Sequence, residues 1–220
     1  MSSAPPPGRR RAGLNRQRVV EETLAMIDEQ GLAAVTMRAL AARLGVEAMS
    51  LYKHVANREA LFDAVVTRVI AALAEGGAAP GGPAAGWRPY LTGMAREIRR
   101  RVVAHPNAFV LVVTRRPGPP WISPPLCSAE WVEALLAGLR REGFSDEQAR
   151  YGYRALNRFL LGFLWLETST LAATGAAEPY DAGRYPTLHE LSGTLAEHRF
   201  DAEFEAGLQS TLDQIGAVLV

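Results

Sequence analysis

Residues 36–55 read TMRALAARLGVEAMSLYKHV, and this stretch decides the fold. The spacing of its apolar positions predicts two short helices with a sharp turn between them at Gly45. Glycine adopts the positive φ that such a turn requires without a steric penalty. Leu44 before the turn can pack against Leu51 after it, so the stretch predicts a helix-turn-helix.

The second of these helices is short enough to enter the major groove of DNA. Its expected outward positions are mostly polar or small. They are Glu47, Ala48, Ser50, Tyr52, Lys53 and His54.

Helical periodicity continues along the chain on both sides, and no strand alternation interrupts it. The fold class is therefore all-α. The expected helices cover residues 15–30, 36–44, 47–54, 57–75, 87–104, 128–141, 145–173, 187–197 and 201–218. Residues 76–86, GGAAPGGPAAG, form the clearest linker, because glycine and proline break helices and few side chains there can pack.

Charge is unevenly distributed along a chain whose net charge is only +1. Residues 1–58 hold nine basic and five acidic side chains, whereas residues 59–220 hold fifteen and eighteen. A basic head suits nucleic acid, although a solubilising basic tail explains the charge equally well. The single cysteine, Cys127, forms no internal disulfide, and no signal peptide or membrane span is recognised, so we expect a cytoplasmic protein.

Enzyme signatures are missing from the sequence. It contains no glycine-rich phosphate loop, no Ser–His–acid pattern and no paired Cys/His spacing. Its four histidines, at positions 54, 105, 189 and 198, do not share metal-ligand spacing. We therefore expect no catalytic residues, no cofactor and no metal site.

The pattern Leu51-Tyr52-x-His54-Val55, followed by Asn57-Arg58 and an apolar helix, resembles the DNA-binding domain of the TetR family of regulators. The resemblance is strong over residues 14–69 and weaker to the end of the chain. It is closest to the tetracycline-repressor branch. It implies a three-helix DNA-binding domain with a connecting helix over 14–75 and a ligand-binding and dimerisation domain over 87–220. Residues 1–13 are rich in proline, glycine and arginine, so we expect a disordered basic tail there.

The resemblance also implies roles for single residues of the DNA-binding domain. Phosphates and bases would be contacted by Thr36, Arg38, Ala48, Met49, Ser50, Tyr52, Lys53, His54 and Arg58. Thr36 equally suits a helix N-cap, and the ring of Tyr52 can be partly buried. Ala48, Met49 and Lys53 differ from the tetracycline repressor, so its operator sequence is not implied here. For Arg9, Arg10 and Arg11, a minor-groove arm and a loosely bound tail both remain open.

In the C-terminal domain the resemblance implies an effector pocket. Tetracycline repressor binds its drug with magnesium through histidine and asparagine side chains, where this chain has Ala74, Met94 and Leu111. Apolar side chains cannot replace those ligands, so we expect a largely apolar, metal-free effector. The candidate lining is Met94, Ile98, Phe109, Leu111, Thr114, Arg115, Trp131, Asn157 and Trp165. Most of these residues are equally suited to an ordinary core.

The segment 159–166, FLLGFLWL, is apolar on nearly every face of its helix and therefore predicts burial against a second copy of the chain. The sequence thus predicts a homodimeric repressor that binds a palindromic DNA operator and leaves it when a small molecule binds. An activator of the same fold and a helical protein-binding module without DNA binding are the alternatives.

Overall fold

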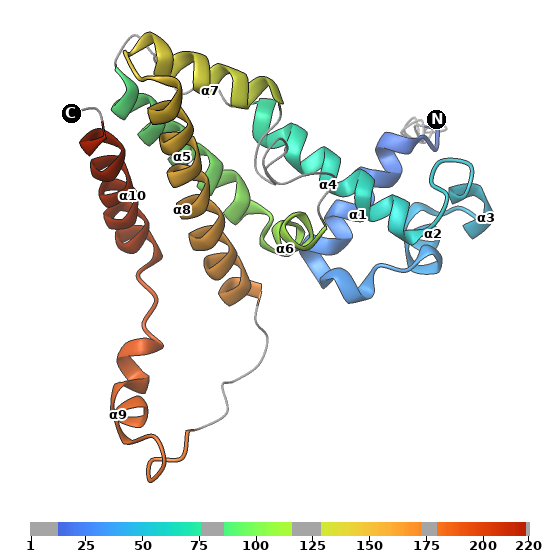
Figure 1. Cartoon of the computed structure of the whole chain (residues 1–220). Helices are drawn as coiled ribbons and strands as arrows, with labels where there is room; N and C mark the ends of the chain where they lie inside the picture. The colour runs from blue at the N-terminus through green and yellow to red at the C-terminus, as the bar shows by residue number, and fades with distance from the viewer. Residues whose placement is uncertain (1–12, 76–85, 116–128, 173–179, 219–220) are drawn as a thin grey trace, which may run out of the picture. The chain divides into compact units, whose positions relative to one another are not determined.

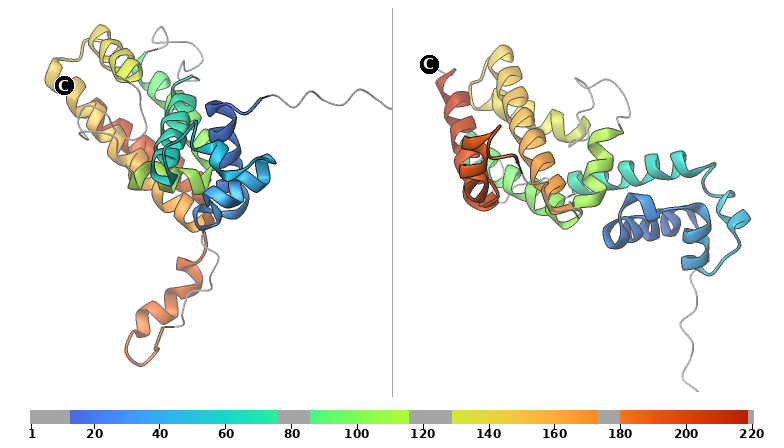
Figure 2. Two further views of the ribbon diagram at one scale, coloured as in Figure 1. Left: turned by 90° about the vertical axis from the view of Figure 1, so that its right-hand side faces the viewer. Right: turned by 90° about the horizontal axis from the view of Figure 1, so that it is seen from below.

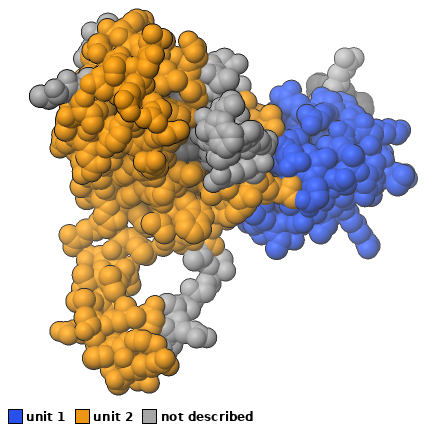
Figure 3. Space-filling view, in the orientation of Figure 1, with its two compact units in different colours: residues 1–65 blue, residues 66–220 orange. Residues whose placement is uncertain are grey.

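The computed structural model describes residues 13–75, 86–115, 129–172 and 180–218 (Figure 1). Within these ranges the regular elements are all helices, which confirms the all-α prediction. The chain divides into two compact units, residues 1–65 and 66–220 (Figure 3). None of the described helices is long and apolar enough to cross a lipid bilayer. The expected tail and the linker fall almost wholly outside the described residues.

The first unit is built from short helices. They are α1 (Arg16–Gln30), the 3₁₀ turn η1 (Leu32–Ala34), α2 (Met37–Leu44), α3 (Ala48–Leu51) and the start of α4 (Arg58–Glu75). Asn15 caps α1, since its side-chain oxygen accepts the N–H of Arg18 at 2.8 Å. Gly31 ends α1 with φ 77°, a conformation that glycine adopts without strain.

Apolar side chains from every helix of this unit meet in one core. The buried set includes Val19, Val20, Ile27, Val35, Leu40, Leu44, Leu51, Leu61 and Val65. The predicted contact between the helices on either side of Gly45 therefore has buried residues on both sides, Leu44 and Leu51. α3 is shorter than the expected 47–54, because the chain leaves the helix at Tyr52.

The second unit holds the remaining helices. They are α5 (Trp87–Ala104), α6 (Pro106–Thr114), α7 (Ala129–Arg141), α8 (Asp146–Ala172), α9 (Pro186–Leu195) and α10 (Phe200–Ala217). The long α8 packs against α5, α6, α7 and α10, so it is the central helix of the unit (Figures 1 and 2). The helix starts with a capping box. Ser145 N–H donates to Gln148 Oε1 at 2.7 Å, and Gln148 N–H donates to Ser145 Oγ at 3.3 Å.

Residues 106–114 form a helix, α6, that was not among the helices expected from the sequence. Pro106 ends α5 but occupies the first turn of α6, where its missing N–H would have no helical partner in any case. Proline therefore separates two helices here rather than preventing the second.

α8 and α10 approach each other closely through aromatic side chains. The ring of Phe204 on α10 lies 5.5 Å from that of Phe159 and 5.4 Å from that of Phe163. Opposite Phe159 stands Gly207, where a Cβ atom would come within 2.6 Å of the Phe159 ring. Leu160, Leu164 and Leu208 are buried within the same chain.

That burial corrects part of the sequence interpretation. The segment 159–166 is not buried against a partner on every face, because α10 covers much of it. The outward face of α8 nevertheless exposes Trp165 by 45% and Leu166 by 62%. α9 contributes no buried residue and is drawn apart from the other helices of its unit (Figures 1 and 2).

Candidate nucleic-acid interface and effector region

The turn between α2 and α3 is set by Gly45, whose φ of 69° lies in the left-handed region. Its N–H donates to the carbonyl of Ala42 at 3.1 Å, and the N–H of Val46 donates to that of Ala41 at 3.0 Å. These two bonds satisfy the last carbonyls of α2 and start the chain toward α3. Leu51, which is fully buried, then anchors α3 on the core.

Anchoring at Leu51 leaves the other side chains of α3 and the following turn outward. Met49 is 71% exposed and Tyr52 is 45% exposed, while Lys53 is also exposed. Ala48, Ser50 and His54 are half-buried. The structure therefore brings six of the nine predicted DNA-binding residues onto one short segment with an accessible surface.

Two further predicted contacts belong to α2. Thr36 caps this helix, since its hydroxyl accepts the N–H of Ala39 at 3.1 Å, and it remains exposed. Arg38 in the first turn is exposed as well. The N-cap interpretation of Thr36 is confirmed, and the cap leaves the residue on the surface.

Arg58, the ninth predicted residue, is engaged inside the first unit. Its Nε donates to the carbonyl of Val35 at 2.7 Å, and its Nη2 donates to that of Leu32 at 3.1 Å. The guanidinium also lies 4.5 Å from the centre of the Phe62 ring. This engagement was not expected from the sequence.

Arg43 is a second basic residue with a local partner. It forms a two-pronged ion pair with Glu29 of α1, at 2.6 and 2.7 Å. The hydrogen bond to Arg43 lowers the pKa of Glu29, and the same bond raises the pKa of Arg43. Arg43 therefore joins α2 to α1, and the basic charge of the head is not all directed outward.

The candidate effector residues occupy different environments in the second unit. Met94, Ile98, Phe109 and Leu111 are buried, with at most 3% exposure. Asn157 is half-buried, and its Nδ2 donates to the carbonyl of Tyr153 at 2.9 Å. Thr114 and Trp165 are exposed and Arg115 is half-buried. The side chains of Ala74 and Trp131 lie outside the described part of the chain.

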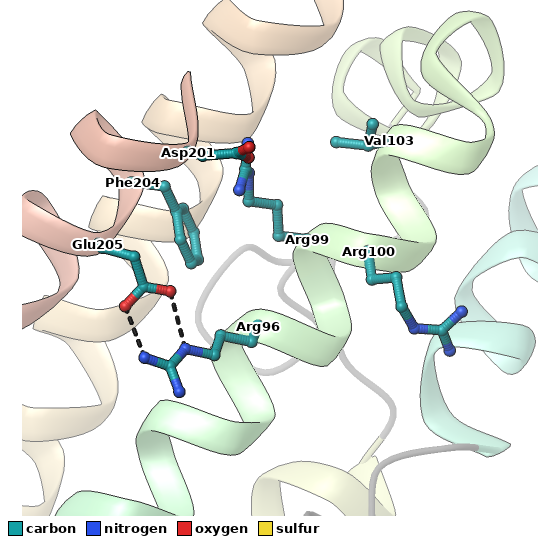
Figure 4. Close-up of a pocket in the computed structure, with 7 residues that line it drawn as sticks. All are labelled: Arg96, Arg99, Arg100, Val103, Asp201, Phe204 and Glu205. Atoms are coloured by element: carbon teal, nitrogen blue, oxygen red, sulfur yellow. Dashed lines mark hydrogen bonds and ion pairs between the residues drawn. The ribbon is translucent and has the colours of Figure 1, made fainter. Parts of the chain in front are cut away.

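One cavity of about 300 Å³ lies between α5 and α10 (Figure 4). It is lined by Arg96, Arg99, Arg100, Val103, Asp201, Phe204 and Glu205. Another, of about 400 Å³, lies between α7 and α8 and includes Arg140, Arg150 and Tyr153. Neither of these two cavities is lined by a predicted effector residue.

The cavity beside α10 contains an ion-pair network that sequence reasoning missed. Arg99 pairs with the buried Glu167 and, at 2.7 Å, with Asp201, while its guanidinium lies 4.9 Å from the centre of the Phe204 ring. The only sequence signal is a carboxylate, Glu167, directly after the apolar segment 159–166. A buried charge requires a partner, but the sequence does not say which of the many arginines supplies it.

Among the described residues, no group of three or more His, Cys, Asp or Glu side chains is placed to hold a metal ion.

Comparison with known proteins gives matches over both units. Residues 19–65 match the family model "Bacterial regulatory proteins, tetR family", and residues 79–219 match "Tetracyclin repressor-like, C-terminal domain". The class D tetracycline repressor of Escherichia coli is 29% identical over 204 residues, which cover 91% of this chain and 88% of that protein. The transcriptional repressor DrrR1 of Streptomyces coeruleorubidus is 30% identical over 222 residues, covering 91% and 76%.

Among solved structures, the TetR family protein ActR of Streptomyces coelicolor in complex with actinorhodin superposes with a TM-score of 0.69. It is 28% identical, and the match covers 94% of this chain and 99% of ActR. The family matches fall on the helix-turn-helix unit and on the helical unit that follows it. This chain therefore belongs to the TetR family of bacterial regulatory proteins, as a DNA-binding, ligand-responsive regulator related to the tetracycline repressors.

Proposed function

We propose that the chain is a homodimeric repressor that binds a palindromic operator through α3 and leaves it when a small, largely apolar molecule binds the second unit. The observation that carries the proposal is the exposure of Met49, Tyr52 and Lys53 around a helix anchored by Leu51. A short helix with one buried anchor and an accessible polar rim suits the major groove. Such a protein acts by binding rather than by catalysis, in the cytoplasm where chromosomal operators lie.

Base contacts are assigned to Ala48, Met49 and Ser50, at the start of α3. Phosphate contacts are assigned to Tyr52, Lys53 and His54 after it, and to Thr36 and Arg38 on α2. Phosphate contacts orient a protein on DNA, while contacts to base edges select the sequence. This division makes the sequence preference of the protein a property of very few side chains.

The dimer is supported by apolar surface on the second unit. α8 exposes Trp165 and Leu166, and α9 exposes Leu191 by 46% and Leu195 by 59%. Large apolar side chains that are exposed on a protein surface can mark protein interaction sites. A second copy of the chain covers them in this proposal, and the two-fold symmetry of a dimer requires a palindromic site.

The effector region is assigned to the buried apolar side chains of Met94 and Ile98 on α5 and of Phe109 and Leu111 on α6. The assignment also includes Thr114, Arg115, Trp131, Asn157 and Trp165. An apolar ligand would pack against these side chains in place of some of the contacts that they now make with one another. A hydrogen bond to the amide of Asn157 would orient the ligand. ActR, which is similar to this chain, has been solved with actinorhodin. That precedent supports an organic effector for this chain.

The connection to DNA runs through α4, which begins in the first unit and ends in the second. Arg101 of α5 donates a hydrogen bond to the carbonyl of Ala72 in the last turns of α4. α5 also carries Met94 and Ile98, so a ligand that shifts α5 would shift the end of α4. A coupling of about 3 kcal/mol would weaken the operator complex by roughly 150-fold.

The proposal is tested by letting the purified protein select duplexes from a random-sequence pool. We expect a palindrome whose half-sites lie about one helical turn apart, bound by one dimer. Selection of a single, unrepeated half-site would contradict the dimeric repressor. Failure to retain any duplex at low salt would instead favour a protein-binding module. Activation and repression are then separated by a reporter gene placed behind the selected site.

A further inference from the structure

The first residue of α4, Arg58, joins two parts of the head that are distant in sequence. Its guanidinium donates to the carbonyls of Leu32 and Val35, in and directly after η1. Both bonds span more than twenty residues of the chain. Between the two ends lies the segment 36–57, which contains α2, the turn at Gly45 and α3.

The two carbonyls that Arg58 binds lie in the turn that leads directly into α2. The carbonyl of Leu32 also accepts the N–H of Val35 at 3.3 Å, so it closes the 3₁₀ turn. Val35 is fully buried, and the next residue, Thr36, is the N-cap of α2. The direction in which the chain leaves Val35 therefore sets the direction of α2.

Arginine is suited to this task in a way that lysine is not. Its planar guanidinium presents several N–H donors in a fixed arrangement, so one side chain can bind two acceptors and resist rotation between them. The ring of Phe62, 4.5 Å from the guanidinium carbon, supplies a face against which the plane rests. Asn57 caps α4 just before it, with its side-chain oxygen accepting the N–H of Ala60 at 2.8 Å.

We propose that Arg58 is a positioning residue for operator recognition rather than a phosphate ligand. It holds together the two ends of the segment 36–57 and thereby fixes the angle at which α2 presents α3. The inference rests on the proposed DNA-binding function. It replaces the phosphate contact that the family resemblance implies for this position.

The two roles predict different changes in the free protein. If Arg58 holds the two ends of the segment 36–57 together, Arg58→Lys loosens the turn at residues 32–35. Hydrogen exchange of the backbone amides of residues 32–40 then becomes faster in the free protein, without DNA. A phosphate ligand predicts no change there. Lys53→Gln is the matched control, because Lys53 is exposed and its replacement leaves that turn untouched.

The roles also predict different binding to DNA. The probes are a duplex selected by the wild-type protein and a scrambled duplex of equal length, titrated at several salt concentrations. For Arg58→Lys we expect about tenfold weaker binding to the selected duplex, unchanged binding to the scrambled one, and an unchanged salt slope. Lys53→Gln should weaken binding to both duplexes and reduce the slope by about 0.9 for each phosphate that the protein no longer neutralises.

Arg58→Gln completes the set. Under the proposal Arg58→Gln behaves as Arg58→Lys does, because the role of Arg58 depends on its planar set of N–H donors and not on its charge. If Arg58→Gln reduces the salt slope as Lys53→Gln does, and Arg58→Lys restores both slope and affinity, the positioning role is overturned. Equally weakened binding to both duplexes with unchanged exchange at 32–40 would overturn it as well. If the wild-type protein selects no duplex, the proposed function fails, while the exchange measurement still decides whether Arg58 holds the turn.

Discussion

Arg99 of α5 and Glu167 of α8 form a two-pronged ion pair inside the second unit, with Nη2–Oε1 at 2.6 Å and Nε–Oε2 at 2.9 Å. The Glu167 side chain is only 2% exposed and that of Arg99 only 16%. An ion pair so placed is costly to break on one side alone, because the largely buried Arg99 guanidinium is then left with only the exposed carboxylate of Asp201 as its partner.

Glu167→Gln should therefore destabilise the second unit by about 3 kcal/mol. Urea unfolding followed by circular dichroism measures this difference. Glu205→Gln is the control, because Glu205 pairs with Arg96 at 2.7 Å on the surface and should cost less than about 1 kcal/mol. Equal destabilisation by the two variants would show that the buried pair carries no special weight.

The stability of the second unit should also depend on pH through Glu97. Hydrogen bonds from Arg100 and then from Arg101 lower the pKa of this carboxyl from 4.5 to about 2. Because the folded pKa is the lower one, the contribution of Glu97 is complete above pH 4.5 and is lost as the pH falls toward 2. Unfolding of wild type and Glu97→Gln should differ at pH 7 and converge in acid. A difference that is constant with pH would assign the effect to packing.

The dimer is best tested on the outward face of α8. Leu166→Arg places a charge in the proposed interface, so it should yield a folded monomer in light scattering, with an unchanged helical spectrum. Leu160 and Leu208 are unsuitable for this purpose, because both are buried within one chain. Leu160→Arg serves as the contrasting variant, and we expect it to unfold or aggregate. A dimer that survives Leu166→Arg would place the interface elsewhere.

Recognition by α3 separates into two kinds of substitution. Tyr52→Ala should weaken binding to all duplexes by a similar factor, because a phosphate contact carries no sequence information. Met49→Gln and Ser50→Ala should change which bases are preferred, with about 1–3 kcal/mol at an affected position. Repeating the selection from a random pool with each variant measures both effects. A changed preference for Tyr52→Ala would reassign that residue to base readout.

An apolar effector should release the protein from its operator without a divalent metal. Compounds are titrated into the protein–DNA complex with and without EDTA, and release is followed by fluorescence anisotropy. The expected result is the same release curve in both, since Met94 and Leu111 offer no metal ligands. Release that stops with EDTA and returns with magnesium would show that the effector binds as a metal complex.

Local sequence signals predicted most of the fold. Gly45, the cap at Thr36 and the box formed by Ser145 and Gln148 each act on their own immediate neighbours, so the sequence alone is sufficient to recognise them. The observed helices differed from the expected ones where one residue carried two opposing sequence signals. Pro106 looked like an interruption, although proline also suits a first helical turn.

Long-range pairing was not predictable in the same way. In the sequence, Arg58 looks like any of the many surface arginines. Only the folded chain shows that its guanidinium donates hydrogen bonds to the carbonyls of Leu32 and Val35. The same holds for Arg99, whose partner Glu167 lies 68 residues away. Arginine-rich helices offer several equivalent candidates for each carboxylate, and packing of the helices decides among them.

Gly207 and Phe159 have a consequence for how this sequence can change over time. The ring of Phe159 occupies the space that even the methyl group of an alanine at position 207 would need. Position 207 is therefore not free to change alone. Any descendant with alanine or serine at 207 must first acquire a smaller or displaced side chain at 159, so the two sites should mutate as a coordinated pair, in that order.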